Sequence, residues 1–230
     1  MMNRRFAMLA ALVAALCAPA FADTATPAPP AAPTPGPTPN ASEAKFVAQV
    51  RADLTKRFPT AALAERAGYL RFGNEDKTGS ISYALREWTS ADPAHPSQLW
   101  YDAKGRLLGA DFSVLQADSP QEPSLWGIQP ARWSKFGQHV HYGLVGPNGT
   151  TKYGAMRPQK YADAGGDPMH PTADGLVKAG IATSADQVKF VFTFPAIWDL
   201  EVWVLPNPTG AFAEYNPNVK PSATGGGMSM

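Results

Sequence analysis

The stretch Phe136-Gly-Gln-His-Val-His-Tyr-Gly-Leu-Val145 carries the clearest strand pattern of the chain. Successive side chains of a β-strand point to opposite faces of a sheet, so residues two positions apart share a face. One face is mostly apolar and suits a core: Phe136, Gln138, Val140, Tyr142 and Leu144. The other face carries both histidines of the stretch: Gly137, His139, His141, Gly143 and Val145.

The residues after this stretch predict a turn and a second arm, which together make an antiparallel hairpin. Pro147-Asn-Gly149 fits a type I turn followed by a left-handed glycine, the three-residue loop with a bulge. This loop sets Met156 opposite Val140, on the core face. The proline favours that register over a two-residue loop, which would place Met156 beside His141.

Two of the four histidines, His139 and His141, project from one side of the predicted strand. Imidazole nitrogen is a good ligand for zinc and for copper, so two histidines at this spacing can bind one ion. A stable site needs a third and usually a fourth ligand. The side chains that could supply them are distant in the sequence: His95, His170, Asp199 and Glu201. The alternative interpretation is that both rings lie on the solvent side of the sheet and bond to their neighbours.

Locally, the His-x-His strand resembles the metal-binding strand of alpha-type carbonic anhydrases. The resemblance covers this short stretch alone, and no later strand supplies the third histidine that the family uses. The fold and activity of that family are therefore not carried over to this chain.

The other two histidines, His95 and His170, lie in a short motif that occurs twice, Asp-Pro-x-His-Pro, at residues 92–96 and 167–171. Proline on both sides stiffens the backbone and holds each histidine in a defined loop. If the two loops meet over the face that bears the other two histidines, four imidazoles converge on one metal site. The alternative is two similar turns with exposed histidines.

Residues 1–22 predict a cleaved export signal. An arginine pair at 4–5 precedes an apolar run over 6–16 and the small-x-small cleavage site Ala20-Phe-Ala22. The apolar run is too short to span a bilayer. The one cysteine, Cys17, lies inside this signal, so the mature chain has no disulfide and no cysteine metal site. We therefore expect a periplasmic or secreted protein whose mature form has no transmembrane segment.

Composition divides the rest of the chain into three parts. Residues 23–41 are rich in proline, alanine and threonine, which predicts an extended, semi-rigid linker. Residues 42–210 predict a single globular α+β domain. Residues 211–230 predict a C-terminal extension that ends in a disordered tail of glycine and methionine.

Charge and motifs exclude several classes of function. Removing the two arginines of the export signal from the 20 basic residues leaves 18, against 19 acidic residues. Nucleic acid is therefore not expected as a partner, because phosphate binding relies on clustered lysine and arginine. The hydrolase motifs Gly-x-Ser-x-Gly and His-Glu-x-x-His are absent. A dispersed Ser-His-Asp set stays open, because such sets are recognised by geometry.

The order of helix and strand patterns predicts an α+β fold. Asn40 and Glu43 have capping-box spacing before a helix that ends near Arg57, and a second short helix ends at Gly68. Alternating segments then predict about seven or eight strands: 69–72, 81–86, 99–102, 106–114, 136–145, 150–156, 188–194 and 198–204. We expect a mainly antiparallel sheet of hairpins, curved or partly closed into a barrel, with one short helix at 172–179 before the last two strands. Residues 157–170 are expected to form a long loop.

These patterns together predict an exported binding module of bacterial type, with zinc or copper bound through histidines. A cell-envelope module that binds a glycan or a protein without metal is the alternative, and a hydrolase with a dispersed histidine-containing site is a third. The six tryptophans bear on this choice. Exposed tryptophan rings could form a platform for sugars, although most are expected in the core because each buries a large area.

Overall fold

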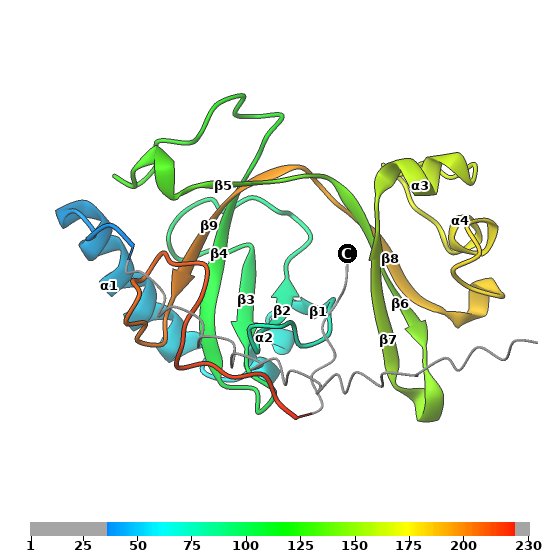
Figure 1. The fold of residues 1–230 in the computed structure, drawn as a ribbon, viewed down its shortest axis with the longest axis horizontal. Coiled ribbons are helices and arrows are strands. Elements are labelled where there is room, and N and C mark those ends of the chain that lie inside the picture. The colour runs from blue at the N-terminus through cyan, green and yellow to red at the C-terminus, as the bar shows by residue number, and fades with distance from the viewer. Residues whose placement is uncertain (1–35, 224–230) are drawn as a thin grey trace, which may run out of the picture. The chain divides into compact units, whose positions relative to one another are not determined.

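Two antiparallel sheets organise the chain in the computed structural model, which describes residues 36–223 (Figure 1). The predicted export signal, most of the predicted linker and the last residues of the tail lie outside the described residues. The helices and 3-10 turns are α1 (Ala41–Arg57), α2 (Ala61–Arg66), η1 (Pro130–Arg132), η2 (Pro147–Gly149), α3 (Pro158–Asp163), α4 (Ala173–Lys178) and η3 (Ala185–Gln187). The strands are β1 (Leu70–Arg71), β2 (Ile81–Ala84), β3 (Gln98–Tyr101), β4 (Leu107–Leu115), β5 (Ser134–Phe136), β6 (His139–Val145), β7 (Thr151–Met156), β8 (Val188–Phe194) and β9 (Ile197–Trp203).

The larger sheet has six strands in the order β1-β2-β3-β4-β9-β5, and the smaller sheet has three in the order β7-β6-β8. Short connections join β5 to β6 and β8 to β9, so two nearly continuous strands run from one sheet into the other (Figure 1). The predicted α+β class, with N-terminal helices before antiparallel strands, is confirmed. The strands divide between two sheets, and no sheet within residues 36–223 closes into a barrel.

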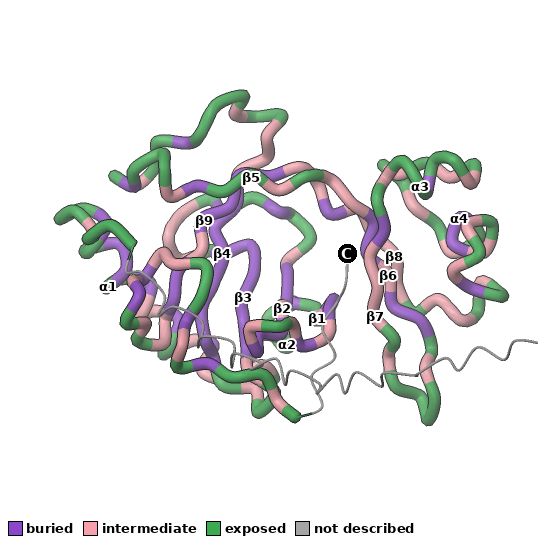
Figure 2. Tube along the Cα trace, viewed as in Figure 1, coloured by how far each residue is buried: buried purple, intermediate pink, exposed green. Residues whose placement is uncertain are grey.

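Helix α1 begins as its sequence predicts and packs on the larger sheet. The Asn40 side chain accepts a hydrogen bond from the Glu43 backbone N–H, and the Glu43 carboxylate accepts one from the Asn40 N–H, each at 2.9 Å. This reciprocal pair is a capping box, which satisfies two N–H groups that have no partner within the helix. The buried stripe of the helix lies in the same core cluster as Phe112 of β4: Phe46, Val47, Val50 and Leu54. Figure 2 shows that β3 and β4 are buried along most of their length.

The central hairpin has the predicted register. Val140 pairs with Met156, so the methionine lies on the face opposite the histidines. The turn itself differs from the prediction, because Asn148 and Gly149 are both left-handed, with φ of 56° and 76°. Asparagine and glycine are the residues that adopt this conformation most readily.

Residues 157–170 are not simply a loop, because they contain α3. Pro158 occupies the start of this helix, where its fixed φ is compatible with a helix and its missing N–H is not needed. Tyr161 of α3 is almost fully buried, and it packs with Leu176 of α4 against the Val140 face of the smaller sheet. The prediction missed this helix because it is short and is followed by the glycine-rich run at 165–166.

The packed chain continues beyond residue 210. Val219 is buried in one cluster with Trp100, Leu108 and Trp203, and the Trp203 indole N–H donates to the carbonyl of Ala213. These contacts attach the C-terminal segment to the larger sheet. None of the helices in residues 36–223 is long and apolar enough to cross a membrane.

Candidate functional site

The histidine pair, His139 and His141, lies on the face of β6 opposite Val140, which packs against α3 and α4. On β8, Phe194 is the partner of His139 and Phe192 is the partner of His141. Because partner residues in an antiparallel pair share a face, the two histidines and the two phenylalanines point to the same side. His141 is only 4% exposed, whereas His139 is partly exposed. The solvent-side interpretation of this face is therefore wrong for His141.

The two imidazoles converge through their Nε2 atoms, which are 2.9 Å apart. The other ring nitrogen of His139, Nδ1, is 2.9 Å from the carbonyl oxygen of Gly137. A carbonyl only accepts, so His139 Nδ1 carries the proton and donates, and the Nε2 atom of the same ring presents a lone pair toward His141. Metal-binding histidines are typically held in this way, with the second N–H on a carbonyl or carboxylate.

His141 has an unsatisfied nitrogen. Its Nδ1 atom is buried and has no hydrogen-bond partner of acceptable geometry within residues 36–223. If His141 donates from Nε2 to His139, its Nδ1 is a buried acceptor without a donor. If Nδ1 carries the proton instead, two Nε2 lone pairs face each other at 2.9 Å. A cation bound by both Nε2 atoms would remove that repulsion, with the His141 proton on Nδ1.

Aromatic rings surround the histidine pair. His139 stacks on Phe194, with ring centroids 4.4 Å apart, and His141 stacks on Phe192 at 5.6 Å. Phe72, which follows β1, meets His141 edge-on at 4.8 Å. Trp88 packs behind Phe192 and Phe194, with centroids 5.8 and 4.4 Å away. We call these four residues the aromatic shell.

Trp88 also has an unusual backbone. Its φ is 55°, in the left-handed region that a bulky side chain rarely adopts. Such strain persists only where the surrounding structure imposes it, and it concentrates at functional sites. Trp88 is 4% exposed and packs in the aromatic shell, whereas Trp126, with the same φ of 55°, packs on Phe46 in another core cluster.

Burial sets the protonation of the histidine pair. It lowers the pKa of His139, and it lowers the pKa of His141 to about 3, with the neighbouring His139 as the second cause. The backbone of Gly154 acts weakly in the opposite direction on His141 without reaching hydrogen-bond geometry at Nδ1. Both rings are therefore neutral at pH 7, the form in which imidazole binds metal.

The two glycines that flank the pair differ in their surroundings. A Cβ atom placed on Gly143 would come within 2.3 Å of the Phe190 ring, so the Phe190 side chain fills the space at the Gly143 end of the pair. A Cβ atom placed on Gly137 would meet nothing within 4 Å, and Gly137 is exposed. The partly exposed His139 therefore lies at the open end of the pair, and the buried His141 at the filled end.

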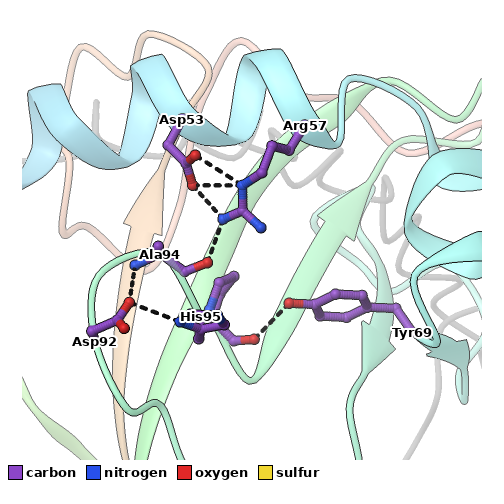
Figure 3. A network of polar contacts seen from close by, with 7 residues as sticks. Asp53, Arg57, Tyr69, Asp92, Ala94 and His95 are labelled. Carbon is purple, nitrogen blue, oxygen red and sulfur yellow. Dashed lines mark hydrogen bonds and ion pairs between the residues drawn. The ribbon is translucent and has the colours of Figure 1, made fainter.

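The two Asp-Pro-x-His-Pro motifs form similar turns away from the pair. In each turn the aspartate bonds to the histidine Nδ1 at 2.9 Å, and both histidine side chains are largely exposed. The turn of His95 lies against α1, where Arg57 donates to the Ala94 carbonyl and the Tyr69 hydroxyl donates to the Pro96 carbonyl (Figure 3).

The turn of His170 lies on the other face of the smaller sheet. Gln138 and Thr193 both donate to the carbonyl of Pro168. Because Thr193 alternates with Phe192 and Phe194, it points away from the histidine pair. Within residues 36–223, no three histidine, cysteine, aspartate or glutamate side chains form a group that could hold a metal ion. The structure thus brings together His139 and His141 and leaves His95 and His170 in separate turns.

A second buried polar group, the acid cluster, consists of Asp111 on β4 and Asp199 and Glu201 on β9. Asp111 pairs with Glu201, and Asp199 pairs with Ser113 across the same two strands. Asp111 accepts from the Trp100 indole N–H at 2.8 Å, and Asp199 accepts from the Ser113 hydroxyl at 2.8 Å. Asp199 and Glu201, considered from the sequence as further metal ligands, belong to this cluster instead.

Burial raises the pKa of all three carboxyls of the acid cluster, to about 7 for Asp199 and about 8 for Glu201. As a carboxylate, Asp111 would leave Oδ1 without a donor; when protonated, it can bond to Asp199. Asp111 was not among the residues predicted to belong to a site. The signal was available, because the strand around it is apolar on both faces, a pattern typical of a strand buried on both sides.

Comparison of the chain with protein-family models, curated proteins and solved structures found no match. No known protein therefore indicates the chemistry of the site, which is inferred from the residues of this chain alone.

One stability prediction follows from the unsatisfied nitrogen of His141. His141→Phe in metal-free protein removes the unsatisfied Nδ1 and keeps the ring packing, and the lost contact with Nε2 of His139 costs less because His139 is partly exposed. The free energy of unfolding should therefore rise by about 1 kcal/mol. Urea denaturation at pH 8 with a chelator measures this change. His95→Phe, at an exposed position, should change stability by less than about 0.5 kcal/mol. A loss of stability on His141→Phe would show that the polar contacts of His141 stabilise the folded protein more than its unsatisfied Nδ1 destabilises it.

Proposed function

We propose that this chain is an exported metal-binding module in which His139 and His141 bind one zinc or copper ion through Nε2. The observation that carries the proposal is the convergence of the two Nε2 atoms at 2.9 Å, with His139 held by the Gly137 carbonyl in the tautomer that a ligand needs. The export part rests on the predicted signal at residues 1–22.

The burial of the tryptophans favours this function over a glycan-binding module. Five of the six tryptophans are buried, and the sixth, Trp126, is partly buried and packs on Phe46 at 5.5 Å. A sugar platform needs several exposed rings in one surface. The tryptophans instead fill the cores of the domain.

Titration calorimetry with zinc and with copper tests the proposal. His139→Ala and His141→Ala should each weaken binding at least 10-fold, because one imidazole alone cannot close the site. Gln138→Ala is the matched control, because Gln138 points to the other face and bonds to the Pro168 carbonyl. His95→Ala and His170→Ala, both in exposed turns, should bind like wild type.

Two results would oppose the proposal. Wild-type protein that binds neither ion more tightly than about 10 μM, roughly −7 kcal/mol, would show that the pair is a structural contact. Loss of binding on His95→Ala or His170→Ala would move the site to the turns.

A further inference from the structure

We propose that the histidine pair selects a soft monovalent ion, Cu(I), held by two nitrogens, over Zn(II) and Cu(II). This inference rests on the proposed function and narrows it to one oxidation state. Three features of the site carry it: the number of ligands, the apolar surroundings and the open end at Gly137.

The number of ligands separates the candidate ions. Protein zinc sites have three or four protein ligands, and Cu(II) prefers a tetragonal arrangement of nitrogen and oxygen donors. The described residues 36–223 add no third histidine, cysteine or carboxylate to the pair. Cu(I) has a filled d shell and is stable with two nitrogens in a line, so it is the ion that this donor set can satisfy.

The apolar surroundings of the pair also favour a monovalent ion over a divalent one. The aromatic shell stacks on both imidazoles and meets His141 edge-on. The cost of transferring an ion into such a medium grows with the square of its charge, so a divalent ion costs about four times as much as a monovalent one. Neutral imidazoles carry no negative charge to offset that cost, which is therefore larger for Zn(II) or Cu(II) than for Cu(I).

Binding an ion in a line between the two Nε2 atoms requires one imidazole ring to move slightly away from the other. With nitrogen–metal bonds of about 2 Å, the two Nε2 atoms would be about 4 Å apart, roughly 1 Å farther than in the metal-free pair. His141 is fixed between Phe72 and Phe192, whereas His139 is partly exposed beside the open space at Gly137. We therefore infer that the ring of His139 moves and that the ion enters from the side of His139.

Competition titrations test the selectivity. The full chain carries Cys17→Ser, because the single thiol of the sequence would itself bind Cu(I). Cu(I) is titrated without oxygen against the chromogenic chelator bicinchoninate, and Zn(II) is titrated against a zinc indicator. A double variant with His139→Phe and His141→Phe keeps the ring packing and reports binding by the seven methionines and the other two histidines. His139→Gln, at the partly exposed position, is the variant least expected to disturb folding.

The expected result is one Cu(I) per chain, at least 1,000-fold tighter than Zn(II), lost in the double variant and weakened in His139→Gln. X-ray absorption at the copper edge should then show two nitrogen neighbours. Zn(II) bound by the same histidines as tightly as Cu(I), or copper with four light neighbours, would overturn the selectivity and leave the proposed function standing. Cu(I) and Zn(II) binding unchanged in the double variant would overturn both.

Discussion

Asp199→Asn should make the protein more stable at pH 8, by about 2–4 kcal/mol, and should change its stability little at pH 4. Asp199 is buried, and burial raises its pKa from 3.8 to about 7. An acid whose pKa is higher in the folded state contributes stability at low pH, where both states are protonated. That contribution is lost as the pH rises from about 4 through 7, because the unfolded state releases the proton first.

Asparagine has nearly the shape of the protonated acid and does not ionise, so the variant escapes this loss. Urea denaturation at several pH values between 4 and 8 measures the free energy of unfolding of the variant and of the wild type. The difference between the two should grow with pH. Asp118→Asn, on the exposed turn after β4, is the matched control and should show no such growth. A wild type that is more stable at pH 8 than the Asp199→Asn variant would mean that the carboxylate is paired with a cation in the folded protein.

Phe194→Ala should lower the free energy of unfolding by about 3–5 kcal/mol. Phe194 is 5% exposed, and its ring lies 4.4 Å from both His139 and Trp88, measured between centroids. Truncation removes these contacts and leaves a cavity between the two sheets. The metal affinity should fall with it, because His139 loses the ring that supports it.

Val191→Ala is the control for this substitution. Val191 lies on the other face of β8, is partly buried and packs in the cluster formed by α3, α4 and the smaller sheet. Its truncation removes fewer atoms and should cost less than the loss of the Phe194 ring. A urea melt in which Val191→Ala is the more damaging change would mean that the buried face of β8 has been assigned incorrectly.

Local features of the chain were predictable from sequence because they depend on near neighbours. The capping box joins Asn40 and Glu43, which are three positions apart. The pairing of Val140 with Met156 is set by the short turn between the two strands. The helix α3 was missed because a six-residue helix gives little periodic signal. Its stability depends on burying Tyr161, a contact with distant residues.

The environment of the histidine pair was not predictable for the same reason. Alternation placed His139 and His141 on one face, and the solvent side of the sheet was one interpretation of that face. In the structure, Phe190 from β8 fills the space beside Gly143, and Phe72 covers His141 from the other side. A single sequence does not show which distant side chains occupy the space that a glycine leaves.

The location of a bound ion tests the central claim most directly. Crystals of the protein grown with copper or zinc, with diffraction data collected at the absorption edge of that metal, give an anomalous difference map. The strongest peak should lie between β6 and the aromatic shell, about 2 Å from the Nε2 atoms of both His139 and His141. A peak at His95 or His170 instead, or no peak beside the pair, would contradict the assignment of these two histidines as metal ligands.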